Sequence, residues 1–395
     1  MIYRIRVWDR SNGDDRPVGE MVCEIAEGGR ARSAFRYEHE YLERPEAFAL
    51  DPVSLPLKSD SFSTDQGLFG IFEDSLPDDW GRNLLIRKHQ ISRHEQNLPR
   101  LLLALGNSGL GALSFTDHAK PPPPVCDISV IYLSALVEAA EKFERGEMQD
   151  KELSILLNAG SSPGGARPKA VVVDEESTIH YLAKFPSVKD QVDVVKLEAA
   201  TMNLAAKAGL AVPCTRLVPC SGKSVLLVQR FDVIPAGRRH MISFQTLLKA
   251  RGYYQQRYHE LLGIVRKYSS NPQEDSERLF RQMVFNAVMG NTDDHLKNFW
   301  MVYDHEQGWR LSPAFDLVPD VGRRGEHVLF FDLDPYYPGR KNLGQLGKHW
   351  GIRNSESVVE QVFAAVSGWR EAFASGGVTD NEIARFKEID SHLQE

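Results

Sequence analysis

A ten-residue polar segment, residues 290–299 (GNTDDHLKNF), lies between two apolar segments and constrains the fold more than any other feature. Upstream, apolar residues at helical spacing predict a buried helix that begins after an N-cap at Asn271 and ends at Gly290 in the left-handed conformation. Downstream, residues 299–303 and 309–311 are typical of two strands joined by a turn. The fold must therefore hold a polar loop between a buried helix and a hairpin.

The spacing of the polar residues indicates a kind of chemistry. Asn298 follows Asp293 by five positions, and Asp316 comes after the hairpin. Protein kinases use this order: an Asp that accepts the proton of the substrate hydroxyl, then an Asn and a second Asp on Mg²⁺. Magnesium prefers oxygen ligands, which both side chains offer. A hydrated acidic turn after a helix explains the short motif equally well, so the rest of the chain must decide.

Composition and charge restrict the class of protein. The 395 residues are enough for two or three domains, and a formal net charge of −7 argues against nucleic acid as the principal direct partner. The cysteines Cys23, Cys126, Cys214 and Cys220 lack zinc or disulfide-framework spacing and are expected to be reduced thiols. No signal peptide or membrane span is recognisable, so we expect a cytoplasmic protein.

The first third of the chain predicts a separate domain. Alternating apolar residues at 3–7 predict an opening strand. Residues 72–82 predict a compact structural loop anchored by Trp80, and the alternative for its acidic segment 77–81 is a binding loop. A helix is expected from Asn83. The proline run 121–124 is a stiff linker that cannot join a sheet interior, so the first domain boundary is placed there.

The middle of the chain predicts a β-rich lobe. The glycine-dense segment 158–169 precedes a strand, and such a loop lets backbone N–H groups approach phosphates, although a flexible hairpin loop has the same composition. The next strand carries a single charge, Lys184. The helix predicted over 194–208 has Glu198 at the edge of its buried stripe, and a half-buried carboxylate needs a cation. A strand Lys paired with a helix Glu is a second kinase feature.

The β-rich lobe is expected to end at a crossover. A strand over 224–228 leads through Gln229 into the Pro-, Gly- and Arg-rich residues 235–240. From Ile242 onward the pattern predicts mostly helix, except for the hairpin described above.

Taken in chain order, these features resemble the HipA family, bacterial serine/threonine kinases that act as toxins of type II toxin–antitoxin modules. The motifs that carry the resemblance are Pro77-Asp78-Asp79-Trp80-Gly81-Arg82, Gly111-Ala112-Leu113, Gly164-Gly165-Ala166-Arg167-Pro168-Lys169, Arg230-Phe231-Asp232, Thr292 to Phe299 and Phe315-Asp316. The resemblance implies an α+β fold, with a two-lobed protein-kinase-like part and an N-terminal accessory α/β domain. The expected domains are 1–120 (accessory), 121–235 (β-rich N-lobe with the Gly-rich loop) and 236–395 (helical C-lobe).

The resemblance also implies residue roles, with ATP and Mg²⁺ as cofactors. Asp293 would be the catalytic base, Asn298 and Asp316 would bind the metal, and Glu198 would pair with Lys184. The implied nucleotide-binding residues are Gly164, Gly165, Ala166, Arg167, Pro168, Lys169, Lys184, Gln229, Arg230, Phe231, His295, Leu296, Lys297, Asn298, Phe315 and Asp316. Family members are inactivated by phosphorylation of a serine in the Gly-rich loop, which would be Ser162 or its neighbour Ser161. Gln229 departs from the Glu of the family's best-known member.

The partners implied by the family are a protein substrate, for which an aminoacyl-tRNA synthetase is one candidate, and a dimeric HipB-like helix-turn-helix antitoxin. DNA would be contacted only indirectly, through the antitoxin, and no membrane is involved. Other classes stay open. A small-molecule or lipid kinase could use a similar Asp-x-x-x-x-Asn loop, and the Asp-x-His pattern at Asp293 is also found in lipid kinases. A non-catalytic corepressor would be expected to lose Lys184, Asp293, Asn298 or Asp316, and none of these is lost. A metal hydrolase using Asp293, Asp294 and His295 lacks a second histidine-bearing motif.

Overall fold

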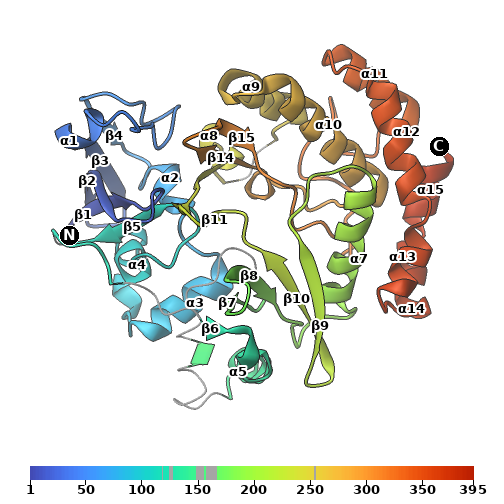
Figure 1. The fold of residues 1–395 in the computed structure, drawn as a ribbon, viewed down its shortest axis with the longest axis horizontal. Coiled ribbons are helices and arrows are strands. Elements are labelled where there is room, and N and C mark those ends of the chain that lie inside the picture. Colours follow the sequence, from blue (N-terminus) through green and yellow to red (C-terminus); the bar gives the residue numbers. More distant parts are fainter. Residues whose placement is uncertain (118, 124–127, 148–154, 157–166, 253–254) are drawn as a thin grey trace.

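The computed structural model describes all residues of the chain except 118, 124–127, 148–154, 157–166 and 253–254 (Figure 1). Much of the predicted Gly-rich loop, with Ser161, Ser162, Gly164, Gly165 and Ala166, therefore lies outside the described residues. The described cysteines Cys23, Cys214 and Cys220 are free thiols. In the described part of the chain, helices long and apolar enough to cross a bilayer are absent.

The N-terminal part is built on an antiparallel sheet with the strand order β4-β3-β2-β1-β5. Its elements are β1 (Ile2–Asp9), β2 (Arg16–Ile25), β3 (Ala31–Tyr37), α1 (His39–Leu42), β4 (Ser61–Thr64), α2 (Gly70–Glu73), α3 (Asp79–Lys88), η1 (Arg93–Glu95), α4 (Leu98–Leu105) and β5 (Leu113–Thr116). The strand predicted over residues 3–7 is confirmed as β1. Phe35 of β3, Phe72 of α2 and Phe115 of β5 are buried together in the core that fixes the helices to the sheet.

The prediction of a compact loop over residues 72–82 is wrong in part, because this segment contains helical turns. Helix α2 ends at Glu73 and α3 already begins at Asp79, four residues before the predicted start. Trp80 and Leu84, one turn apart on α3, both pack into an apolar cluster formed mainly by residues 133–227, where Trp80 contacts Phe143 of α5 (Leu133–Arg145). Because short helices depend on tertiary packing more than on propensity, the early start was not visible in the local sequence.

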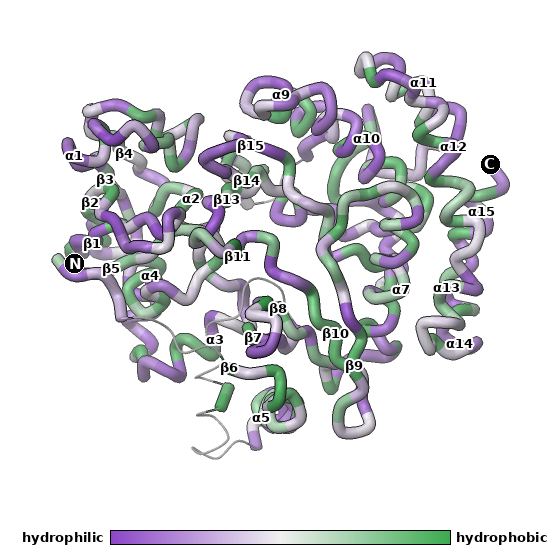
Figure 2. The backbone as a smooth tube through the Cα atoms, viewed as in Figure 1, coloured by the Kyte–Doolittle hydropathy of each residue, from purple (hydrophilic) through white to green (hydrophobic). Residues whose placement is uncertain are grey.

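The middle of the chain forms a five-stranded sheet with the order β6-β7-β8-β10-β9, in which only β6 and β7 are parallel. Its elements are β6 (Ile128–Ser129), η2 (Val130–Tyr132), α5 (Leu133–Arg145), β7 (Lys169–Asp174), β8 (Ile179–Lys184), α7 (Val194–Lys207), β9 (Thr215–Cys220) and β10 (Lys223–Gln229). Figure 2 shows β10 as a mostly hydrophobic strand. Val225 and Leu227 of β10 pack in the cluster that includes α5, whereas Leu226 and Val228 pack against α7. The two helices therefore cover opposite faces, which follows from strand alternation.

The last part is mainly helical and contains a three-stranded sheet with the order β13-β14-β15. Its elements are β11 (Val233–Ile234), β12 (Gly237–Arg238), β13 (His240–Ser243), α8 (Phe244–Leu247), α9 (Tyr258–Tyr268), α10 (Pro272–Met289), η3 (Leu296–Asn298), β14 (Trp300–Asp304), β15 (Gly308–Leu311), α11 (Arg340–His349), α12 (Ser355–Val366), α13 (Trp369–Ser375), α14 (Asp380–Ile383), η4 (Ala384–Phe386) and α15 (Glu388–Gln394). The sequence predicted a two-stranded hairpin, which corresponds to β14 and β15. The structure adds a third strand, because β13 pairs with β14. Figure 1 shows α11 to α15 as an outer layer beyond α10.

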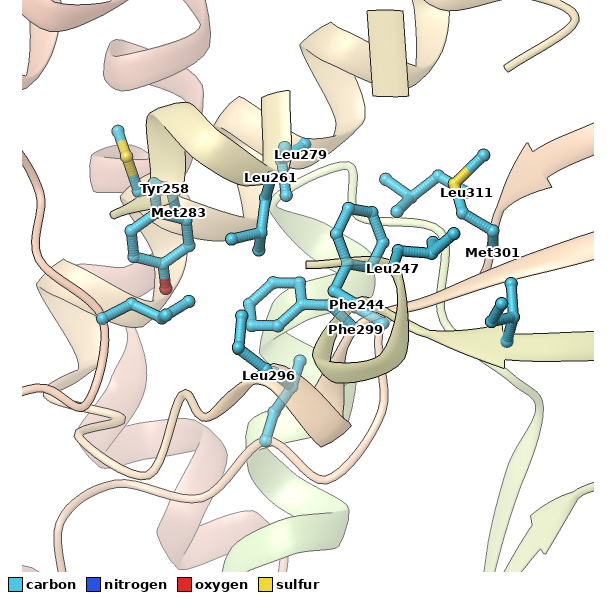
Figure 3. Packing of buried hydrophobic residues seen from close by; sticks show 14 of the residues in the cluster. Phe244, Leu247, Tyr258, Leu261, Leu279, Met283, Leu296, Phe299, Met301 and Leu311 are labelled. Carbon is cyan, nitrogen blue, oxygen red and sulfur yellow. The ribbon is translucent and has the colours of Figure 1, made fainter. Parts of the chain in front are cut away.

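The segments around the polar loop form as predicted. The Asn271 side chain accepts a hydrogen bond from the Glu274 backbone N–H at the start of α10, and Gly290 ends the helix with φ 64°. Figure 3 shows the apolar core into which the loop inserts Leu296 and Phe299, with Leu279 of α10 among the labelled side chains. The loop is thus held by a buried helix on one side and a strand on the other.

Candidate active site

A cavity of about 140 Å³ lies where the three parts of the chain meet. The β-rich lobe and α7 contribute Lys169, Leu182, Lys184, Glu198, Val228 and Gln229. The crossover and the helical part contribute Arg230, Phe231, Asp232, Met241, His295, Lys297, Asn298, Trp300, Phe315 and Asp316. The N-terminal part contributes Glu73, Asp74, Leu76, Asp78 and Leu110. Most of the described residues that were predicted to bind a nucleotide therefore share one cavity.

Lys184 lies between two carboxylates in this cavity. Its Nζ is 2.5 Å from Glu198 Oε1 on α7 and 2.6 Å from Asp316 Oδ1. Burial alone would lower the pKa of Lys184, but Asp316 and Glu198 together raise it above its ordinary value. The positive charge of Lys184 in turn lowers the pKa of Asp316, whereas burial raises the pKa of Glu198. The strand Lys and helix Glu expected to pair do form an ion pair, and Asp316 joins them.

A second lysine lies directly opposite the first. Lys169 of β7 is the cross-strand partner of Lys184, so two like charges face each other in the sheet, an arrangement that costs stability. Burial, with Lys184 nearby, lowers the pKa of Lys169 to about 8. Together with Lys297 and His295, these groups give the cavity several cationic or hydrogen-bonding side chains. Such an arrangement suits an anionic ligand.

Asp316 has an unusual backbone conformation. Its φ of 57° lies in the left-handed region, which costs non-glycine residues free energy and which Asp tolerates better than most. Phe315 beside it packs on Phe231 with 5.9 Å between ring centroids, and the Ala314 N–H donates to the Ala211 carbonyl at 2.8 Å. These contacts hold the strained residue with its carboxylate directed at Lys184, although the side chain is still 42 % exposed.

Asp293 and Asn298 are joined through the loop backbone. Asn298 Nδ2 donates to the Asp293 carbonyl at 2.8 Å, which uses the amide nitrogen and leaves the amide oxygen without a hydrogen bond from any described residue. The Asp293 carboxylate does not line the cavity. It is 59 % exposed and accepts from Arg324 Nη1 at 2.9 Å. Asn298 therefore lines the cavity with an amide oxygen that accepts from no described residue, whereas the Asp293 carboxylate is exposed to solvent.

Asp294, next to Asp293, is buried and anchors the loop. Its Oδ2 accepts from the Tyr258 hydroxyl at 2.6 Å and lies 2.9 Å from His327 Nδ1. Its Oδ1 accepts from the backbone N–H groups of Val328 at 2.8 Å and Leu329 at 3.2 Å. Burial, with Asp294 nearby, raises the pKa of Tyr258 well above its ordinary value. One buried carboxylate therefore joins the polar loop, α9 and residues 327–329.

Some predicted residues lie elsewhere or make other contacts. Leu296 is fully buried in the core, and neither Leu296, Pro168 nor Arg167 lines the cavity. Arg167 is exposed and pairs with Asp190. Arg230 does line the cavity, but its guanidinium is buried and bonds Asp232 at 2.6 Å.

The sequence did not predict that side chains of the N-terminal part line this cavity. Asp74 accepts from the Ser243 N–H and hydroxyl, each at 2.8 Å, and burial raises its pKa to about 6 in spite of these bonds. Asp78 Oδ1 lies 3.0 Å from Lys297 Nζ. The Pro77–Arg82 motif marked this region, but nothing local in the sequence says that it packs onto a cavity formed some hundred positions later.

Comparison with known proteins identifies the family. The chain matches the family model for the HipA-like C-terminal domain over residues 161–369, more than half of its length, and the HipA N-terminal domain over residues 14–116. Two curated relatives come from Sinorhizobium fredii: "Putative kinase Y4mE" is 25 % identical, covering 89 % of this chain and 84 % of the relative, and "Putative kinase Y4dM" is 26 % identical, covering 78 % and 77 %.

A solved structure has the same fold. It is a chain of the Shewanella oneidensis MR-1 toxin–antitoxin complex of HipA, HipB and operator DNA, superimposed with a TM-score of 0.70 over 98 % of this chain and 95 % of that one, at 19 % identity. The cavity-lining residues named above all lie within these two family matches. This chain belongs to the HipA family of kinases and has the two-lobed, protein-kinase-like fold of that family.

Proposed function

We propose that this protein is an ATP- and Mg²⁺-dependent serine/threonine protein kinase of the HipA type. The observation that supports this most directly is Lys184, held between Glu198 and Asp316 in the cavity that the polar loop also lines. Kinases need this combination to orient the phosphates of ATP next to a metal ligand. Family membership supports the same reaction class.

The residues that line the cavity suit ATP. Leu110, Leu182, Val228, Met241 and Trp300 offer apolar surface for a flat base. Lys169, Lys184 and Lys297, which also line the cavity, offer positive charge to the phosphates.

The oxygen donors of the cavity suit magnesium. Asp316 would provide a carboxylate ligand, and the Asn298 amide oxygen, which accepts from no described residue, would provide a neutral one. Among the described residues there is no cluster of three or more His, Cys, Asp or Glu side chains that could hold a metal, so phosphate oxygens and water would complete the coordination. Bound Mg²⁺ would neutralise charge on the β- and γ-phosphates.

Asp293 is the proposed general base. The hydroxyl oxygen of the acceptor would form a bond to the γ-phosphorus as the bond to the ADP oxygen breaks, and the hydroxyl proton would pass to the Asp293 carboxylate. Arg324 now occupies one oxygen of that carboxylate. Because both side chains are more than half exposed, their pairing contributes only about 0–1 kcal/mol, and an acceptor can displace Arg324 at little cost.

The test of this function compares the purified protein with its Asp293→Asn variant. Each is incubated with γ-labelled ATP and a cell lysate that contains aminoacyl-tRNA synthetases, the proposed but unidentified class of target. We expect label on serine or threonine of lysate proteins, reduced about 10²–10⁴-fold in the variant, because an amide cannot accept the proton. Equal labelling by both proteins, or label on small molecules alone, would contradict the proposal.

We further propose that Ser162, or its neighbour Ser161, is autophosphorylated and that this inactivates the kinase. A phosphate adds about −1.5 to −2 charge and would repel the ATP phosphates. Mass spectrometry should find the modification in the active protein and not in Asp293→Asn. Modification of neither serine in the active protein would remove this part of the proposal.

The proposed partner is a dimeric HipB-like helix-turn-helix protein that provides the DNA contacts. The formal net charge of −7 suits such a division, because DNA binding requires cations against the phosphate backbone. HipB and operator DNA are components of the solved complex to which the fold is similar. Tight binding of DNA by this chain alone at physiological salt would contradict the division.

A further inference from the structure

A second concave surface, which we call the basic hollow, lies outside the nucleotide cavity and is about 510 Å³ in volume. Three segments far apart in the sequence form it: residues 189–191 after β8, residues 321–323, and Arg385 of η4. Arg167 completes it. Arg167 was expected from the family resemblance to bind the nucleotide, but it lines this surface and not the nucleotide cavity.

The basic hollow is strongly positive in an acidic protein. Four cationic side chains (Arg167, Lys189, Arg323 and Arg385) line it with one carboxylate, Asp190, whereas the whole chain carries a formal net charge of −7. Asp190 is already occupied, since it accepts from Arg167 Nε at 3.0 Å and from the Ser187 N–H at 2.9 Å.

The positive charges of the other three cations are not balanced by carboxylates of the described residues. Lys189, Arg323 and Arg385 form no ion pair with any residue that the structure describes, and Arg385 makes only a long hydrogen bond of 3.5 Å to Gln191. Such a concentration of unpaired like charge is unfavourable by itself and becomes favourable when an anion binds.

The basic hollow is connected to the proposed catalytic base through Arg324. Residues 321–323 run directly into Arg324, whose guanidinium donates to Asp293 at 2.9 Å. Asp320 fixes this turn, because its Oδ2 accepts from the backbone N–H groups of Arg324 and, at 3.1 Å, Gly325. A polypeptide whose hydroxyl reaches Asp293 would therefore pass its neighbouring residues over or beside the basic hollow.

We propose that the basic hollow binds an anionic segment of the acceptor polypeptide, next to the serine or threonine that is phosphorylated. The ligand chemistry is that of a carboxylate or a phosphate, supplied by acidic or already phosphorylated residues. This inference rests on the proposed kinase function and adds a substrate preference to it. Because each exposed charge pair contributes little, the preference arises from several cations acting together and weakens as salt screens them.

The test uses synthetic peptides that contain one serine. Glutamate, phosphothreonine, alanine or lysine is placed in turn at each flanking position, so that the two anionic sources are compared with a neutral and a cationic residue. The enzyme carries Ser161→Ala and Ser162→Ala, so that its own loop cannot supply a phosphate. At the preferred position we expect kcat/KM to be about tenfold higher with glutamate or phosphothreonine than with lysine, chiefly through KM, and the ratio to shrink with added salt.

The matched variants reverse charge inside and outside the basic hollow. Arg323→Glu with Arg385→Glu should abolish or invert the preference and leave ATP affinity unchanged. Lys207→Glu, at the exposed end of α7, reverses a charge elsewhere and should keep the wild-type preference. The same proteins are assayed on a cell lysate, where the double variant should lose labelling at sites with acidic flanks.

The outcomes separate the two proposals. The proposed role of the basic hollow is wrong if peptides or lysate proteins are labelled efficiently without dependence on flanking charge. It is also wrong if the preference survives in the Arg323→Glu, Arg385→Glu variant. Either result leaves the kinase function intact. Absence of labelling of any peptide or lysate protein overturns the kinase function and this inference with it.

Discussion

Asp316 combines a strained backbone with a functional carboxylate. Its left-handed φ of 57° is accessible to Asn as well as Asp, so Asp316→Asn should keep the local conformation and remove only the charge. We expect the affinity for Mg-ATP, measured calorimetrically, to fall about ten- to hundredfold, as for a lost hydrogen bond or ligand contact to a charged group. Lys184 keeps Glu198 as a partner, so the melting temperature should change little. An unchanged affinity would mean that the metal ligand lies elsewhere.

Lys169 should make nucleotide binding depend on pH. Burial lowers its pKa to about 8, so the free protein loses this charge as the pH rises through that value. Bound phosphates favour the protonated form, which means that binding above pH 8 requires uptake of a proton, and ATP affinity should fall as the pH rises further.

The control for this pH dependence is Lys169→Arg. A guanidinium stays charged over the whole range, so the decline in affinity above pH 8 should disappear in the variant. Dissociation constants measured on both sides of pH 8 test this. A decline of the same steepness in both proteins would assign the titration to another group.

At the scale of elements, the sequence predicts best where local signals and packing agree. Helix α10 has an Asn–Pro start, an apolar stripe and a terminal Gly290, and it occurs as expected. Strand β13 and the first turn of α3 were missed for a common reason. Strand β13 forms because it pairs with β14. The first turn of α3 forms because Trp80 packs against α5 and its neighbours. Both contacts join segments too distant for periodicity to reveal.

The Asp294 contacts predict that α9 helps to position the polar loop. Tyr258→Phe removes one of the four hydrogen-bond contacts of Asp294 and also an acceptor for Asn286 Nδ2, while the ring remains packed. We expect the free energy of unfolding to fall by about 1–2 kcal/mol and phosphotransfer to slow, because the loop that carries Asp293 loses an anchor.

Tyr268, at the other end of α9, provides the matched control. Its hydroxyl has no hydrogen bond to any described residue, so Tyr268→Phe should change the free energy of unfolding by no more than about 0.5 kcal/mol. Denaturant unfolding followed by activity assays compares the two variants. Equal stability and equal rates would show that the Tyr258–Asp294 contact does not position the loop.

At the scale of the whole molecule, the sequence motifs predicted the cavity residues of the β-rich lobe and of the helical part. They did not predict the cavity residues of the N-terminal part. Lys184, Glu198 and Asp316 could be proposed as one constellation because kinase spacing relates them. The contribution of Asp74 and Leu110 could not be proposed, because it depends on how the N-terminal sheet docks, and for Asp78 a binding loop was only the alternative to a structural one. That docking is fixed by buried contacts such as Asp232, which accepts from the Gly111 N–H at 2.9 Å.

The docked N-terminal part should therefore control nucleotide binding in the lobes that follow it. Leu110 is half-buried and lines the cavity, so Leu110→Glu would put a carboxylate into the space that we assign to ATP. The carboxylate would lose hydration and repel the phosphates, and we expect ATP affinity to fall at least about tenfold. Leu57→Glu makes the same change at an exposed site of the same domain and should bind ATP like the wild type. If calorimetry gives both variants the same affinity as the wild type, the nucleotide does not contact the N-terminal part.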